Sequence, residues 1–171
     1  NDILVKGPSS LNDIFSVMLG FRRYKVGILI DISKFYQTVL SCQRDQHVRR
    51  VVWRFGDNTA EPRVFLTTRV NFGDRPAGCV AQAALRETAR LYSHISPAAT
   101  EKLLRDSYVD DLVTGAESLS DADLLVDEMS RIVQMGGFQF KEKVVSGSKL
   151  QDGQVRKVLG TCWNHELDFE C

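Results

Sequence analysis

Two adjacent aspartates, Asp110 and Asp111, interrupt a segment that is otherwise apolar and β-branched. The residues on either side favour strands, whereas aspartate tolerates turn dihedrals and seldom lies in the middle of a strand. The pattern therefore predicts a β-hairpin that carries both aspartates at its tip. Two carboxylates beside apolar strands repel each other unless a cation neutralises them. Taken alone, the pair is better explained as an ordinary turn.

A third carboxylate, Asp31, ends an uncharged run at residues 26–30 that is typical of a buried strand. A charged group at this position is costly if it serves structure alone. It could instead cap a helix that begins near Ser33, and for this residue alone the cap and the metal-ligand role are equally favoured. If the two strands are neighbours, Asp31 meets Asp110 and Asp111.

Three converging carboxylates would form an oxygen-only ligand set, which suits Mg²⁺ bound together with the phosphates of a substrate. Two such ions about 3.5–4 Å apart can activate an attacking oxygen and stabilise the leaving oxygen in phosphoryl transfer. The sequence thus indicates phosphoryl-transfer chemistry, on the condition that residues far apart in the chain fold together.

Several short stretches, in their order along the chain, resemble the palm of a reverse transcriptase. They are Asp31 with the aromatic Tyr36 five positions later, then Phe72-Gly73, then Tyr108-Val109-Asp110-Asp111. The surrounding sequence is most similar to the BEL/Pao group of LTR retrotransposons, over residues 70–78, 108–115 and 136–138 and at Leu159, Gly160 and Trp163. The similarity covers nearly the whole chain, and the Tyr-Val-Asp-Asp box is its most specific part.

The resemblance implies an RNA-directed DNA polymerase, in which a primer 3′-hydroxyl attacks the α-phosphate of a deoxynucleoside triphosphate and pyrophosphate leaves. Asp31 and Asp110 would hold two Mg²⁺ ions, for which Mn²⁺ is a substitute, and the Ile32 carbonyl would assist the triphosphate ion. Asp111 would support the ion that activates the hydroxyl. The implied partners are an RNA or DNA template with its primer, the deoxynucleotide and the rest of a Pol polyprotein.

The same resemblance assigns roles around the incoming nucleotide. Tyr36 would sit beneath its sugar, where a ring clashes with a 2′-hydroxyl, although an aromatic core residue is the alternative. Phe72 and Gly73 would line the pocket for the nucleotide and the templating base. An ordinary connection between a strand and a helix is the simpler explanation of that loop when it is taken alone.

Further residues are implied to contact the primer and the leaving group. Tyr108, Gly160 and Trp163 would lie near primer and template, with residues 150–171 forming a primer-gripping region. Trp163 is explained equally well as an anchor of the core. Lys141 or Lys143 would protonate the pyrophosphate; the sequence does not decide between them, and an exposed strand lysine is the simpler explanation of each.

The expected fold is a single α+β domain over residues 1–171. By resemblance it is a polymerase palm with part of the fingers, in which helices pack on one face of an antiparallel sheet in a split βαβ, ferredoxin-like arrangement. A first helix should open near Pro8 and bury one apolar face, formed by Leu11, Ile14, Phe15, Met18 and Leu19. A hairpin is expected at residues 49–55 and 63–70, helices at 77–93 and from a cap at 120–123 to 136, and strands at 138–145 and 154–163.

Composition sets further bounds. The formal net charge is zero, which counts mildly against nucleic-acid binding, although arginines and lysines form local islands. No apolar run approaches the roughly 20 residues that span a bilayer, and the four cysteines are scattered, which favours a reducing compartment. We therefore expect an intracellular protein of a cytoplasmic particle, neither secreted nor membrane-bound. Because the chain begins at Asn1 in mid-motif, we expect a polyprotein fragment that is inactive alone.

Two alternatives come from other functional classes. A decayed or domesticated palm would bind nucleic acid or protein without catalysis, and the presence of all three aspartates together with Tyr36 argues against decay. A plain scaffold, in which the acids are turn and cap residues, predicts that Asp31 lies far from Asp110. An RNA-dependent RNA polymerase is disfavoured, because that class usually has Gly-Asp-Asp and a small residue at the position of Tyr36.

Overall fold

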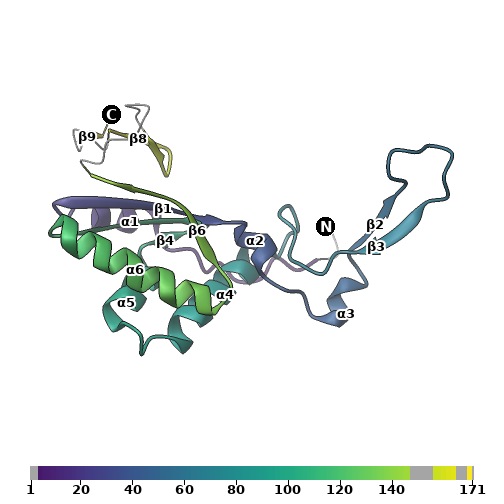
Figure 1. Cartoon of the computed structure of the whole chain (residues 1–171), viewed down its shortest axis with the longest axis horizontal. Coiled ribbons are helices and arrows are strands. Elements are labelled where there is room, and N and C mark those ends of the chain that lie inside the picture. The colour runs from purple at the N-terminus through teal and green to yellow at the C-terminus, as the bar shows by residue number, and fades with distance from the viewer. Residues whose placement is uncertain (1–3, 147–155, 165–168, 171) are drawn as a thin grey trace.

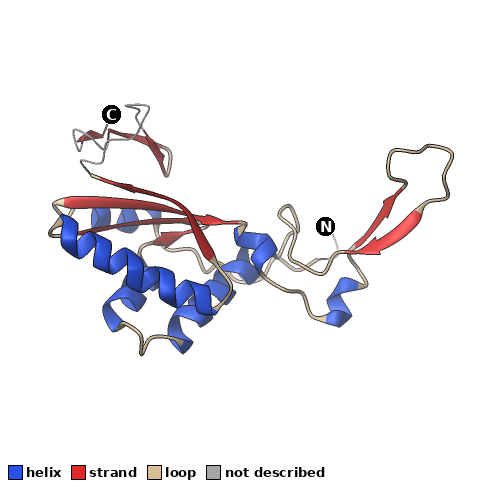
Figure 2. Ribbon diagram, viewed as in Figure 1, coloured by secondary structure: helices blue, strands red, loops and turns tan. Residues whose placement is uncertain are grey.

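The computed structural model describes residues 4–146, 156–164 and 169–170 (Figure 1). In chain order the elements are α1 Ile14–Phe21, β1 Val26–Ser33, α2 Phe35–Thr38, α3 Gln43–Gln46, β2 Arg50–Trp53, β3 Arg63–Leu66, α4 Ala77–Leu91, α5 Pro97–Arg105, β4 Ser107–Tyr108, β5 Asp111–Ala116, α6 Leu119–Met135, β6 Gln139–Val145, β7 Arg156–Val158, β8 Thr161–Asn164 and β9 Phe169–Glu170. The chain is thus of the α+β class, as expected, with antiparallel sheets and separate helices (Figure 2).

A four-stranded antiparallel sheet with the order β4-β5-β1-β6 organises the fold. β4 and β6 therefore lie at the two edges of this sheet, and β1 lies between β5 and β6. Side chains along β1 alternate between the two faces of the sheet. Ile28, Ile30 and Ile32 are almost fully buried on one face, whereas Leu29 and Asp31 belong to the other.

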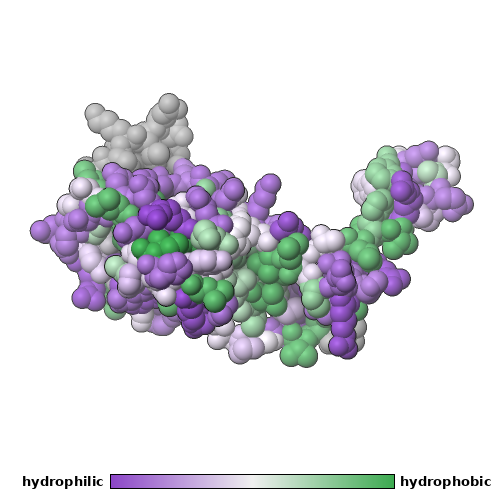
Figure 3. Space-filling view, turned by 60° about the horizontal axis from the view of Figure 1, so that its bottom comes forward, coloured by the Kyte–Doolittle hydropathy of each residue, from purple (hydrophilic) through white to green (hydrophobic). Residues whose placement is uncertain are grey.

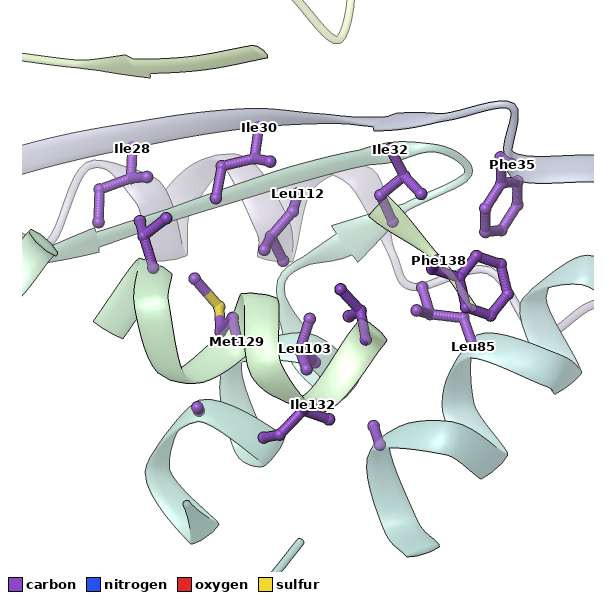
Figure 4. Close-up of a cluster of buried hydrophobic side chains, with 14 of the residues drawn as sticks. Ile28, Ile30, Ile32, Phe35, Leu85, Leu103, Leu112, Met129, Ile132 and Phe138 are labelled. Atoms are coloured by element: carbon purple, nitrogen blue, oxygen red, sulfur yellow. The ribbon is translucent and has the colours of Figure 1, made fainter. Parts of the chain in front are cut away.

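Three helices, α4, α5 and α6, cover the isoleucine face of the sheet (Figure 2). Figure 4 shows Ile28, Ile30 and Ile32 pointing from β1 toward the side chains of these helices, among them Met129 of α6 and Leu103 of α5. The apolar alternation of the strand and the apolar stripes of the helices thus meet in one continuous core.

A second, smaller core lies on the opposite face and corrects the expectation that helices cover one face alone. Val17 and Phe21 of α1 pack there with Val113 of β5 and with Trp163 of β8. Leu112 belongs to the first core, so its neighbour Val113 must point to the other side of the sheet. The carboxylate face is therefore partly covered by α1 and by the β7–β8 hairpin.

The apolar face expected for the first helix is wrong. Asp13 caps α1, because its carboxylate accepts a hydrogen bond of 2.8 Å from the backbone N–H of Ser16, and the helix starts at Ile14 rather than near Pro8. Phe15 and Leu19, two members of the expected face, are 76% and 70% exposed. Val17 and Phe21 point into the protein instead.

Most other expected elements are confirmed, with shifted boundaries. β2 and β3 form the hairpin, α4 begins at Ala77, and β7 pairs with β8. The cap of α6 is Ser118 rather than residues 120–123, and Gly136 ends that helix. α5, whose N-cap is Ser96, was not expected.

Two general expectations can also be compared with the described part of the chain. Within it, no helix is both long and apolar enough to cross a bilayer. Cys42, Cys79 and Cys162 are free thiols.

Candidate active site

The β4–β5 hairpin places Asp110 and Asp111. Tyr108 pairs with Asp111 across the hairpin, so the tip consists of Val109 and Asp110, and Asp111 already belongs to β5. Val109 has a φ of 55°, which is rare for a β-branched residue and stores local strain. The turn therefore carries one aspartate at its tip and holds the next one on a strand.

Asp31 reaches the same place from β1. The antiparallel register of β1 and β5 sets Asp31 directly opposite Asp111. One residue further on, the backbone N–H of Ile32 donates a 2.9 Å hydrogen bond to the carbonyl of Asp110. The scaffold alternative predicted that Asp31 lies far from Asp110, and this separation is not found.

The charges of these residues influence one another. Burial, together with the charges of Asp110 and Asp31, raises the pKa of Asp111 to about 6. The pKa of the Tyr36 hydroxyl is also raised, by burial and then by the charge of Asp110. Like charges shift a pKa in this way only over short distances, so the aspartates share one electrostatic environment.

The two lysines that the sequence left open are separated by the structure. Lys141 forms an ion pair of 3.2 Å with Asp31, whereas Lys143 forms one of 2.9 Å with Asp123 of α6. The Lys141 and Asp31 side chains are 66% and 36% exposed, so water screens their attraction. Lys141 is therefore the lysine that lies at the carboxylates.

The donor set can be tested for its fit to a divalent ion. Among the described residues, no group of three or more His, Cys, Asp or Glu side chains stands in an arrangement that could hold a metal ion. The donors themselves are carboxylate oxygens, the ligands that Mg²⁺ and Mn²⁺ favour. Asp31 and Asp111 also line one cavity of about 280 Å³, together with Glu142 and Lys157. The residues fit the ion in chemical type, but their side chains would have to rearrange to hold it, and the ion pair of Asp31 with Lys141 would have to open.

Tyr36 lies on α2, next to the carboxylates. Its ring packs edge-on against Phe35 at 5.3 Å and contributes to the lining of a cavity of about 220 Å³. Gln82 of α4 also lines this cavity, and its side-chain N–H₂ donates to the carbonyl of Val109. Gln82 is 2% exposed and supports the strained turn, a role that was not expected from the sequence.

Phe72 and Gly73, in the loop before α4, were expected to bind the nucleotide, but neither lines the cavity of Tyr36. Phe72 is 71% exposed and is not among the residues that line the cavity of Tyr36. Gly73 has a φ of 89° in the turn that leads to α4. Arg75 of the same loop and Gly78 of the first turn of α4 do line the cavity.

Part of the expected primer-gripping region lies outside the described residues, namely 150–155, 165–168 and 171. Leu159 and Gly160, with φ values of 47° and 96°, form the two-residue turn between β7 and β8. Trp163 has no exposed surface and meets Phe21 edge to face at 5.0 Å. Its burial supports the core role rather than a contact with primer.

A larger cavity, of about 620 Å³, opens beside the end of β1 and was not expected. Lys34 and Arg69 line it together with Thr38 and Gly137. The Arg69 guanidinium donates hydrogen bonds to the carbonyls of Gln37 and Thr38, which fixes it against α2. Two cationic side chains thus border a polar cavity close to the strand that carries Asp31. A cationic cavity of this kind can receive an anion.

Comparison with known proteins gives no match. No protein-family model matches the chain, and no curated protein matches it.

Proposed function

We propose that this chain is the palm of an RNA-directed DNA polymerase of the type found in BEL/Pao retrotransposons, with part of the fingers. The observation that carries the proposal is the register of β1 and β5, which sets Asp31 opposite Asp111 and next to the backbone of Asp110. Adjacent acids of this kind, drawn from two strands, suit the transfer of a nucleotidyl group.

The topology supports the same proposal. From β1 the chain passes through α4 and α5 to the β4–β5 hairpin, and then through α6 to β6. With the sheet order β4-β5-β1-β6, this is the split βαβ arrangement of ferredoxin-like folds, which is also that of the polymerase palm. The likeness of topology is shared by many functions, so the aspartates carry the functional part of the argument.

Asp31, Asp110 and Asp111, with the Ile32 carbonyl, would hold Mg²⁺, and Mn²⁺ would substitute for it. The bound ions would supply charge neutralisation at the α-phosphate and a lowered pKa of the primer hydroxyl. Asp111 lies on a strand and Asp110 on a strained turn supported by Gln82, so the backbone at both positions is fixed before a ligand arrives. Lys141 neutralises Asp31 until then.

The remaining side chains of the site would orient the substrates. Lys34 and Arg69, at the larger cavity, are suited to the triphosphate because both are cationic and lie just beyond the end of β1. The ring of Tyr36 would exclude a 2′-hydroxyl and so select deoxynucleotides. Template, primer and the rest of a Pol polyprotein would complete the active enzyme.

The alternative is a palm that binds nucleic acid or protein without catalysis. It requires the acids to persist without use, which is hard to reconcile with the raised pKa of Asp111. A site that keeps mutually repelling carboxylates without a bound cation is less stable than one that has lost them.

The test is nucleotide addition to a primer by the complete polymerase that contains this chain. We expect Asp110→Asn to lower the rate by on the order of 10³-fold or more, because phosphoryl transfer depends on charge neutralisation at this position. Asp123→Asn is the matched control: Asp123 lies on α6 and pairs with Lys143, so the rate should be unchanged. Near-normal extension by Asp110→Asn, with folding verified by circular dichroism, would overturn the proposal. No addition by the unaltered protein would favour the non-catalytic alternative.

A further inference from the structure

The β2–β3 hairpin projects from the body of the protein as a separate arm (Figure 1). All eight residues of its strands are exposed, although they include valines, a tryptophan, a phenylalanine and a leucine. Hydrophobic surface is visible on this arm in the space-filling view (Figure 3). An exposed apolar surface of this kind usually marks a binding site.

The register of the hairpin sorts its side chains into two different faces. Directly paired residues share a face of a two-stranded sheet, and successive residues alternate. Val51 with Phe65 and Trp53 with Arg63 therefore form one face, which we call the aromatic face. The opposite face carries Arg50, Val52, Val64 and Leu66, and it has no aromatic ring.

The aromatic face extends beyond the strands and is ordered by its own contacts. Phe55 meets Phe65 edge to face at 5.8 Å. The guanidinium of Arg63 lies 5.8 Å from the centroid of Phe55 and 5.6 Å from that of Phe65. Cation–π contacts hold the arginine over the rings. Trp53, Phe55 and Phe65 are 55%, 65% and 38% exposed, so flat ring surface and positive charge stand side by side in water.

The charge of the arm matches an anionic partner. Residues 49–66 contain four arginines and two acidic residues, a net charge of +2, whereas the whole chain is neutral. Arg49 is engaged with Asp74 at 2.8 Å, whereas Arg63 lies exposed on the aromatic face and Arg50 on the opposite face. Exposed rings beside arginines suit unpaired bases and their phosphates, because bases stack on aromatic rings whatever their identity.

We propose that the aromatic face of the β2–β3 hairpin binds single-stranded nucleic acid, with bases stacked on Trp53 and Phe65 and a phosphate against Arg63. A duplex would bind less well, since its bases are already stacked on one another. The inference is independent of metal chemistry, because the aromatic face belongs to a different sheet from Asp31 and Asp111.

The two tryptophans of the chain make a direct assay feasible. Trp53 is 55% exposed and Trp163 is fully buried, so stacking of a base should quench only the red-shifted emission of Trp53. The full chain is titrated with oligo(dT) or oligo(U) in EDTA. A labelled oligonucleotide, followed by anisotropy, gives the affinity of variants that lack the fluorophore. We expect quenching, and binding that weakens as salt is raised.

Variants on the two faces form a matched pair. Trp53→Ala should weaken binding about tenfold or more, Trp53→Phe should retain most of the affinity because it can still stack, and Phe65→Ala should resemble Trp53→Ala. Val52→Ala and Val64→Ala remove apolar surface from the opposite face and should leave the affinity unchanged. Equal effects on both faces would overturn the proposal, as would equal affinity for a blunt duplex.

Two further outcomes keep this proposal separate from the polymerase function. Self-association that buries Trp53 without oligonucleotide would identify the arm as an interface between copies and overturn the proposal. Asp110→Asn should bind oligonucleotide normally in EDTA. If Asp110→Asn and the unaltered protein extend primers equally while Trp53→Ala loses oligonucleotide, only the assignment of the active site fails. If Trp53→Ala has no effect on binding, only the present inference fails.

Discussion

Asp106 lies only a few residues before Asp110 and Asp111 in the chain, but the protein surrounds it with quite different partners from those of Asp110, Asp111 and the adjacent Asp31. Asp106, between α5 and β4, is 1% exposed. Its oxygens accept hydrogen bonds from the Arg105 guanidinium at 2.8 Å and from the Thr114 hydroxyl at 2.6 Å, and Lys102 lies 3.6 Å away. The protein thus satisfies this charge completely from its own side chains.

The charges of Asp31, Asp110 and Asp111 are compensated far less by side chains of the protein than the charge of Asp106. The ion pair between Asp31 and Lys141 is exposed, and the pKa of Asp111 is raised by burial and by its two neighbours. Placing like charges together costs stability that no described contact returns. The comparison shows how a structural carboxylate differs from a candidate ligand: the first has internal partners, and the second creates a demand for an external cation.

The largest expected effect concerns Asp106, the carboxylate with internal partners. Asp106→Asn should lower the free energy of unfolding by about 3 kcal/mol, because it leaves Lys102 without its counter-charge and disrupts buried hydrogen bonds. Asp31→Asn, in the same buffer with EDTA, should change the stability by less than about 1 kcal/mol. Urea denaturation measures both. Equal losses of stability for the two variants would contradict the distinction between Asp106 and Asp31.

Asp111 gives a smaller effect that depends on pH. Its pKa is about 6 in the folded chain and ordinary in the unfolded chain, so folding favours the protonated form. The stabilisation is present below pH 4 and is lost as the pH rises through 6. Asp111→Asn should therefore be more stable than the unaltered chain at pH 8, by about 1 kcal/mol after allowance for partial exposure to solvent, and equally stable at pH 4.

Thermal denaturation in EDTA at the two pH values checks the effect of Asp111→Asn. Adding Mg²⁺ at pH 8 should raise the midpoint of the unaltered chain more than that of the variant, because an ion that binds only the folded state stabilises it. A variant less stable than the unaltered chain at pH 8 would show that Asp111 is held by contacts of the kind that hold Asp106.

Much of the fold could be predicted because local pattern and tertiary structure agree. The uncharged run at 26–30 became the central strand, and the alternation at 138–145 became β6. The buried face predicted for the first helix was wrong because its apolar residues allow more than one face, and packing against Val113 and Trp163 buries the face that carries Val17. α5 was not predicted because a helix of nine residues with a small apolar stripe gives only a weak periodic pattern.

The candidate site, like the fold, could be predicted from the sequence only in part. The order of Asp31, Asp110 and Asp111 could be read from the chain, but their proximity depends on which strands pair, and only the structure supplies the register. The choice between Lys141 and Lys143 could not be made from sequence, because it depends on the bulge in the pairing of β1 with β6. The burial of Trp163 depends on a contact with α1, far away in sequence.

The smallest expected effect separates these two lysines. Lys141→Gln and Lys143→Gln should each change the stability by less than about 1 kcal/mol, because both ion pairs are exposed. Their effects on Mn²⁺ binding, measured by electron paramagnetic resonance, should differ. Lys141 competes for Asp31, so its loss should tighten binding roughly fivefold, whereas the loss of Lys143 removes only a contact with α6.

Unchanged Mn²⁺ affinity in Lys141→Gln would mean that the lysine does not occupy the place of a cation. In that case its pairing with Asp31 would be an ordinary surface contact, with the same standing as that of Lys143 with Asp123. Tighter binding in Lys141→Gln alone would instead show that one positive charge of the chain stands where a metal ion would bind. Asp31 would then be held by an exchangeable cation and Asp106 by permanent ones.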